Sequence, residues 1–129
     1  MKNLLPLLFT LLFAVTVQAA TPYPEISIKE VKAAMADKKV ILLDANGTDT
    51  WQQGHIPGAI NFDAVKGKLS SVLPADKGAL IVAYCMCPGC PYYLKAADAA
   101  TKLGYTNVKH FTPGIYGWRE SASPVEKGS

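Results

Sequence analysis

The sequence predicts an α/β fold in which a small parallel sheet is covered by helices on both faces. Continuous apolar runs at residues 40–43 and 79–83 are typical of short strands that are buried on both sides. Helical patterns alternate with such runs, and the clearest is the alanine-rich segment 92–103, which stops at Gly104. Strands and helices that alternate at this spacing favour a parallel sheet, and ligands of such folds bind beyond the carboxyl ends of the strands.

The other elements follow from local signals. Ser27-Ile28-Lys29-Glu30 is a capping-box pattern, which predicts the start of a helix. Residues 48–54 predict a short capped helix that stops at a glycine. Residues 59–62 and 108–111 predict strands and residues 115–121 a last short helix, whereas the type of segment 65–72 stays open.

Residues 1–19 have the pattern of a signal peptide. Lys2 gives a basic start, an apolar stretch extends to Val17, and Val17-Gln18-Ala19 is a small-x-small cleavage signature. A membrane anchor is the alternative, but the apolar stretch is short for a span and no basic residues close it. We therefore expect export to the bacterial periplasm, no membrane attachment after cleavage, and a single domain over residues 20–129.

Charge excludes other classes of partner. The chain has 129 residues and a net charge of +3, and its basic residues are scattered, with no run longer than Lys38-Lys39. We therefore expect neither a nucleic-acid partner nor binding to a membrane surface. We also expect no cofactor.

All three cysteines lie in one octapeptide, Tyr84-Cys85-Met86-Cys87-Pro88-Gly89-Cys90-Pro91, between the strand at 79–83 and the helix at 92–103. The unpaired N–H groups and the positive end of a helix favour anions and lower the pKa of a nearby thiol. An odd number of cysteines in an exported protein also leaves at least one thiol without an intramolecular partner. The loop therefore predicts chemistry by sulfur.

The spacing of the cysteines leaves other uses open. Cys87-Pro88-Gly89-Cys90 is a C-x-x-C at a helix start, an arrangement used by thiol–disulfide enzymes, and a structural Cys87–Cys90 disulfide is a further alternative. The three thiolates could instead hold a soft metal such as Cu(I) or zinc. No histidine lies near them in sequence, and we assign no metal site.

Three blocks in the expected order resemble the single-domain rhodanese family of sulfurtransferases. The first is Leu42-Leu43-Asp44 followed by residues 51–61, which resemble the family stretch L-I-D-V-R … G-H-I-P-G-A-I-N. The second is Tyr84-Cys85, which matches the strand-end cysteine that carries sulfur in the family. The third comprises residues 113–118 and 123–126, which resemble G-G-I-x-x-W … P-V-E. The resemblance covers essentially the whole of the expected domain and implies a rhodanese-like fold.

The resemblance also implies a mechanism and partners. Cys85 is expected to take the sulfane sulfur of a small donor (polysulfide, persulfide or thiosulfate) as a persulfide and to pass it to a thiol or to cyanide. No dedicated base is required if the thiol is already ionised. The remaining loop residues are expected to bind the substrate: Met86, Cys87, Pro88, Gly89 and Cys90.

The loop departs from the family pattern in two respects. It has no basic residue between Cys85 and Leu94, which removes the usual charge-assisted contacts to an anionic donor and favours polysulfide or persulfide over thiosulfate. It is also about two residues longer than the common form, so Cys87 is an alternative sulfur carrier. A minor branch of the family with C-x-x-P-x-C loops resembles this spacing better and supports Cys85, with Cys90 as its companion.

Several polar or aromatic residues outside the loop could be assigned a functional role, but the sequence favours a structural role for most of them. We expect His55 to hydrogen-bond the backbone of its own turn, His110 to be a packing residue, and Asp44 to cap the turn after its strand. Trp118 is expected in the core. Tyr92 and Tyr93 are candidates for the rim of a pocket, and Asn46 stands where the family often has arginine.

Overall fold

The computed structural model describes residues 22–128, so the predicted signal peptide lies outside the described residues. The helices are α1 (Ile28–Ala36), α2 (Thr48–Gln53), α3 (Phe62–Val65), α4 (Leu69–Val72), α5 (Tyr93–Lys102) and α6 (Gly114–Glu120), with a 3-10 turn η1 (Lys66–Lys68). The strands are β1 (Ile41–Asp44), β2 (Ile60–Asn61), β3 (Ile81–Tyr84) and β4 (Val108–His110). Between residues 22 and 128 no helix has the length and apolar character needed to cross a membrane.

The sheet confirms the predicted fold class. Over residues 22–128 it has four parallel strands in the order β2-β1-β3-β4. The chain just before α1 extends the sheet beyond β4, because the N–H of Ile26 donates to the carbonyl of His110 and the N–H of His110 donates to that of Pro24, at 3.0 and 2.8 Å. These contacts form a short parallel bridge between Glu25 and His110.

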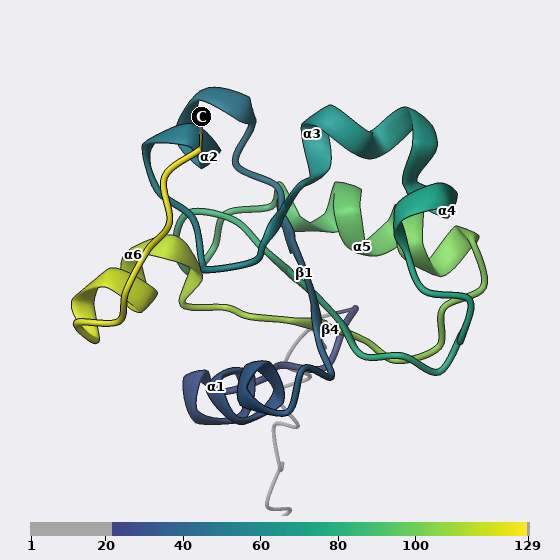
Figure 1. The fold of residues 1–129 in the computed structure, drawn as a ribbon, viewed down its shortest axis with the longest axis horizontal. Helices are drawn as coiled ribbons and strands as arrows, with labels where there is room; N and C mark the ends of the chain where they lie inside the picture. The colour runs from purple at the N-terminus through teal and green to yellow at the C-terminus, as the bar shows by residue number, and fades with distance from the viewer. Residues whose placement is uncertain (1–21, 129) are drawn as a thin grey trace, which may run out of the picture.

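Helices cover both faces of the sheet, with α1 and α6 on one side and α3, α4 and α5 on the other (Figure 1). The side chains of β3 alternate between two hydrophobic cores, as expected for a strand buried on both faces. Ile81 and Ala83 pack against the α5 side, and Val82 and Tyr84 against the α1 and α6 side. This alternation continues past the end of β3 and places Cys85 in the core on the α5 side.

The predicted capping box starts α1. The hydroxyl of Ser27 accepts a hydrogen bond from the N–H of Glu30 at 3.2 Å, and the carboxylate of Glu30 accepts one from the N–H of Ser27 at 2.8 Å. The single fully buried side chain of this helix, Val31, reaches the core beside Trp118. The helix thereby covers the face of the sheet that is opposite to α5.

Candidate active site

The cysteine loop lies beyond the carboxyl end of β3, between the N-terminal ends of α5 and α6. Cys85 directly follows the last residue of β3, as the sequence predicts. At the start of α6 the N–H groups of Ile115 and Tyr116 donate to the carbonyls of Cys85 and Met86, at 2.9 and 3.0 Å. The first turn of α6 therefore fixes the backbone of the loop.

A tight approach of α6 makes these contacts possible. Gly114 has a φ of +63°, and a Cβ at this position would lie 2.6 Å from the carbonyl carbon of Met86 and 2.7 Å from the carbonyl oxygen of Cys85. A real Cβ cannot come so close to backbone atoms. Glycine at position 114 is thus required both for its positive φ and for the packing of α6 on the loop.

The middle of the loop is a turn. The N–H of Cys90 donates to the carbonyl of Cys87 at 3.2 Å, and Gly89 has a φ of +84°. Proline followed by glycine is the order that a type II turn requires, since its third residue needs a positive φ. The turn brings Cys90 back toward Cys85 at the start of α5.

Cys85 and Cys90 form a pair of interacting thiols. Cys85 is only 1% exposed, and Cys90 packs against the same core. The Cys85 thiol donates to the carbonyl oxygen of Cys90, with 3.1 Å between sulfur and oxygen, and each thiol shifts the pKa of the other. Backbone N–H groups surround both sulfurs: that of Met86 contacts both, that of Tyr93 contacts Cys85 and that of Tyr92 contacts Cys90.

The expectation of a lowered pKa is wrong for Cys85 and applies to Cys90 instead. Burial, followed by the contact with Cys90, raises the pKa of the Cys85 thiol and outweighs the N–H groups of Tyr93 and Met86. Partial burial also acts to raise the pKa of Cys90, but the hydrogen bond from Cys85 and the N–H groups of Tyr92 and Met86 lower it on balance. Of the two thiols, Cys90 is therefore the one that ionises first, and Cys85 keeps its proton longer.

Cys87 lies at a different cavity from Cys90. It lines a cavity of about 620 Å³ with Pro88, Thr112 and Tyr116, whereas Gly89 and Cys90 line a separate cavity of about 230 Å³. All three cysteines are free thiols, and the sulfur that interacts with Cys90 is that of Cys85 and not that of Cys87. Across the part of the chain that the structure describes, no group of three or more Cys, His, Asp or Glu side chains is arranged to hold a metal ion.

Two lysines that the sequence reasoning missed lie near the loop. Lys66 and Lys95 line a hollow of about 360 Å³ together with Ala45, Asn46 and Tyr92. Lys66 is bound to Asp63 at 2.8 Å, and the Lys95 ammonium lies 5.3 Å from the centre of the Tyr92 ring. The position of Lys95, three residues after Tyr92 and thus on the same face of α5, was the signal that could have revealed it.

The two tyrosines at the start of α5 have different roles. Tyr92 is 54% exposed and lines this hollow, in agreement with a rim position. Tyr93 is instead buried, and its ring stacks on His110 with 3.4 Å between the centroids. His110 is accordingly a buried packing residue, and burial lowers its pKa.

Asp44 is the turn cap that the sequence predicts. Its carboxylate accepts a hydrogen bond from the N–H of Asn46 at 2.8 Å, two residues further on. Burial raises the pKa of this carboxyl group, against the opposing effects of Tyr84 and Asn46. The Tyr84 hydroxyl accepts a hydrogen bond from the N–H of Ile56 at 3.1 Å, so Tyr84 ties the end of β3 to the segment that follows α2.

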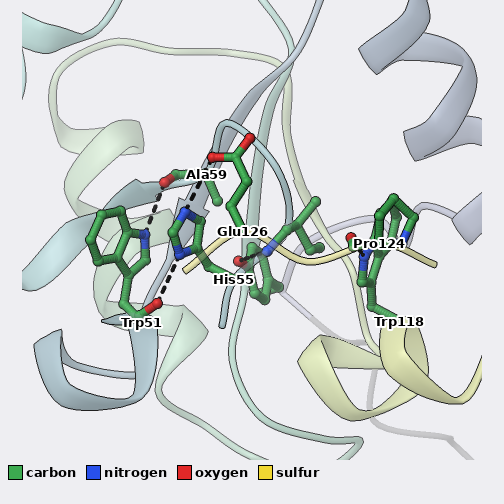
Figure 2. A network of polar contacts seen from close by, with 8 residues as sticks. Trp51, His55, Ala59, Trp118, Pro124 and Glu126 are labelled. Carbon is green, nitrogen blue, oxygen red and sulfur yellow. Dashed lines mark hydrogen bonds and ion pairs between the residues drawn. The ribbon is translucent and has the colours of Figure 1, made fainter. Parts of the chain in front are cut away.

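His55 also has a structural position, as its sequence context indicates. Figure 2 shows the network: the Nδ1 of His55 lies 2.8 Å from the carbonyl oxygen of Trp51, and the two rings stack with 4.0 Å between centroids. The backbones of His55 and Glu126 exchange two hydrogen bonds of 2.9 Å, and the Nε2 of His55 lies 3.7 Å from the Glu126 carboxylate.

The C-terminal segment is held at a second point. The indole N–H of the buried Trp118 donates to the carbonyl of Pro124 at 2.7 Å (Figure 2). The chain end then reaches α2, where the N–H of Gly128 donates to the carbonyl of Gln52 at 3.1 Å (Figure 1). We call residues 124–128, held in this way, the C-terminal strap. The turn at His55 and the C-terminal strap thus hold the fold together, whereas Ile115 and Tyr116 of the third family block contact the cysteine loop.

The fold and the site together place this chain in a class of protein. It is an α/β protein whose buried cysteine lies at the end of a central parallel strand, among backbone N–H groups. A family model described as "Rhodanese-like domain" matches residues 27–121. The chain therefore belongs to the rhodanese-like family.

Individual proteins agree with this assignment. The chain is 34% identical over 92 residues to the HTH-type transcriptional regulator Rv0324 of Mycobacterium tuberculosis, and the match covers 70% of this chain but 39% of the regulator. The chain thus spans well under half of that relative. Among solved structures, the BH2092 protein from Bacillus halodurans is 27% identical with a TM-score of 0.63, covering 81% of this chain and 77% of the other. Human single-domain sulfurtransferase TSTD1 shares the fold at 22% identity with a TM-score of 0.58, covering 75% and 96%.

Proposed function

We propose that this protein is a sulfurtransferase that carries sulfane sulfur as a persulfide on Cys85. The observation that carries the proposal is the position of this thiol at the end of β3, among the N–H groups of Met86 and Tyr93. Such groups stabilise negative charge on a thiolate or on the outer sulfur of a persulfide, and they need no reorganisation during the reaction. The family and the sulfurtransferase among its structural neighbours support the same activity.

The paired thiols suggest how the first step proceeds. As Cys85 attacks the outer sulfur of a donor RS–SH, its proton passes to the thiolate form of Cys90, the neighbouring thiol that ionises more readily. The donor S–S bond breaks, RS⁻ leaves, and a new S–S bond joins Cys85 to the transferred sulfur. An acceptor thiol or cyanide then removes that sulfur. Cys90 thus acts as the base in this step. The sequence suggested that no base is required if Cys85 is already ionised, but the raised pKa of Cys85 makes a base necessary.

Mass spectrometry tests the proposal directly. Reduced protein is exposed to a small persulfide, freed of excess donor and digested without reductant. We expect an adduct of about +32 Da, one sulfur atom, on the peptide that contains the loop. In wild-type protein the added sulfur can be lost if a loop disulfide forms after uptake, and such a disulfide is also evidence of uptake. The adduct itself is therefore measured in the Cys90→Ser variant. The absence of an adduct in that variant, together with the absence of both an adduct and a loop disulfide in wild-type protein, would contradict the proposal.

Donor choice follows from charge and space. The buried Cys85 admits a slim donor more readily than a bulky one, and the loop provides no guanidinium for the sulfonate end of thiosulfate. Each missing charge-assisted hydrogen bond costs about 1.5–3 kcal/mol, roughly ten- to a hundredfold in affinity. We expect weak thiosulfate:cyanide activity and faster turnover with polysulfide or persulfide. Steady-state kinetics with both donor types checks this, and a low KM for thiosulfate would contradict the expectation. If that KM rises in Lys95→Gln, the hollow beside Tyr92 supplies the charge that the loop lacks.

Export is the second part of the proposed function. We propose that residues 1–19 are removed on export to the periplasm and that the protein acts there on small sulfur donors and thiol acceptors. Protein recovered from its native compartment is expected to begin at or near Ala20. N-terminal sequencing after osmotic release checks this, and an intact Met1 or a form that resists carbonate extraction from membranes would contradict it.

A further inference from the structure

The loop contains a second sulfur in reach of the first. The Cys85 sulfur lies 3.1 Å from the Cys90 carbonyl oxygen, and the side chain of Cys90 packs against the same core as Cys85. The two thiols are close enough for each to shift the pKa of the other. The turn over residues 87–90 produces this approach, since it folds Cys90 back onto the end of β3. A persulfide formed on Cys85 therefore has a thiol beside it before any external acceptor arrives.

The two sulfurs differ in their access to solvent. Cys85 is buried under the loop, whereas Cys90 is partly exposed and lines the cavity of about 230 Å³ together with Tyr93, His110 and Thr112. An external thiol can approach the sulfur of Cys90 through this cavity. The cavity is distinct from the larger one that Cys87 lines, so Cys87 is the matched control for any role of Cys90.

We propose that Cys90 resolves the Cys85 persulfide, so that the protein reduces sulfane sulfur to sulfide as well as transferring it. This inference rests on the proposed persulfide at Cys85. The sulfur of Cys90 attacks the sulfur of Cys85, a Cys85–Cys90 disulfide forms, and the bond to the outer sulfur breaks. The outer sulfur takes the electron pair of that bond and the proton of the Cys90 thiol, and it leaves as hydrogen sulfide. Two thiol sulfurs are oxidised and one sulfane sulfur is reduced.

The cycle closes with a reductant of the dithiol class. One thiol of this reductant attacks the partly exposed Cys90 sulfur, and the Cys85–Cys90 bond breaks. The second thiol of the reductant then attacks the mixed disulfide, which releases Cys90 as a thiol and oxidises the reductant to a disulfide. Attack at Cys90 is favoured over attack at Cys85 because only Cys90 lies at the cavity. Without a reductant, each protein molecule releases one sulfide and stops.

A single-turnover experiment tests the resolution step. Reduced wild-type protein is loaded with glutathione persulfide, a donor that loses a thiol and not sulfide, and is freed of small molecules without added reductant. We expect about one equivalent of sulfide per protein and a product about 2 Da lighter than the reduced protein, with the bond mapped to Cys85 and Cys90. Cys90→Ser is expected to retain the adduct of about +32 Da and to release little sulfide. Cys87→Ser keeps both reacting sulfurs, so the fraction of this variant that takes up sulfur is expected to give the lighter product, with the bond mapped to Cys85 and Cys90.

The outcomes separate this inference from the proposed function. A stable adduct of about +32 Da in wild-type protein, with sulfide release no greater than in Cys90→Ser, would overturn the resolving role and leave the sulfurtransferase intact. A disulfide that maps to Cys87 would also overturn it. Absence of sulfur uptake in both wild type and Cys90→Ser would instead refute the proposed function on which the inference rests.

Discussion

Replacement of Cys85 by serine is expected to abolish sulfur transfer, with a loss of activity of at least about a thousandfold. A hydroxyl cannot form a persulfide, and no other thiol occupies the position directly after β3. The fold is expected to survive, because serine is close in size to cysteine and its hydroxyl can still donate to the carbonyl of Cys90. Sulfur transfer to cyanide or a thiol, measured together with thermal unfolding, checks both parts.

The matched variants are Cys87→Ser and Cys90→Ser. Both are expected to retain partial transfer, since each keeps the sulfur of Cys85. Cys90→Ser is the weaker of the two, because it loses the group that accepts the proton of Cys85. An inactive Cys87→Ser beside an active Cys85→Ser would show that the sulfur is carried two residues further along the loop.

Replacement of Gly114 by alanine is expected to damage both the stability and the active site. The positive φ alone costs about 1–2 kcal/mol for a residue with a Cβ. The clash of this Cβ with the backbone of Cys85 and Met86 adds a further 1–3 kcal/mol, roughly, since backbone atoms can move only if α6 or the loop shifts. Urea unfolding measures the first effect, and sulfur loading of the folded fraction measures the second.

Gly58→Ala is the control for the backbone term. Gly58 has a φ of +80°, but a Cβ there would meet no atom within 4 Å. Its replacement is expected to cost only the conformational part of the free energy of unfolding and to leave sulfur loading unchanged. Equal losses of stability in the two variants would contradict a close contact between α6 and the loop.

The sequence predicted the features of this fold that local chemistry decides. The capping box at Ser27 and the buried apolar strands depend on residues close together in the chain, and the structure has them where expected. Segment 65–72 stayed open because its elements are too short to show a period. It contains the 3-10 turn η1 (Lys66–Lys68) and the one-turn helix α4.

The electrostatics of the site could not be predicted in the same way. Proximity to a helix start correctly indicated N–H groups around the thiols, but the charge on Cys85 depends on how deeply the thiol is buried. That depth results from the core that Cys85 shares with Phe62 and Tyr93. Phe62 is distant from Cys85 in sequence, and Tyr93 is separated from Cys85 by the loop turn. The Lys66 and Lys95 side of the site likewise depends on two elements that meet only in the folded chain. Tertiary contacts therefore decide which of the two thiols ionises first.

The contacts made by the two ends of the domain determine when it can fold during synthesis. The segment before α1 pairs with His110, and the turn at His55 pairs with Glu126 of the C-terminal strap. A growing chain presents its first half long before these partners emerge, and pairings between residues far apart in sequence form slowly. Partial chains that end before β4 must leave an edge of β3 and two apolar surfaces uncovered. We therefore expect the complete domain to form only after β4 and the C-terminal strap have been synthesised.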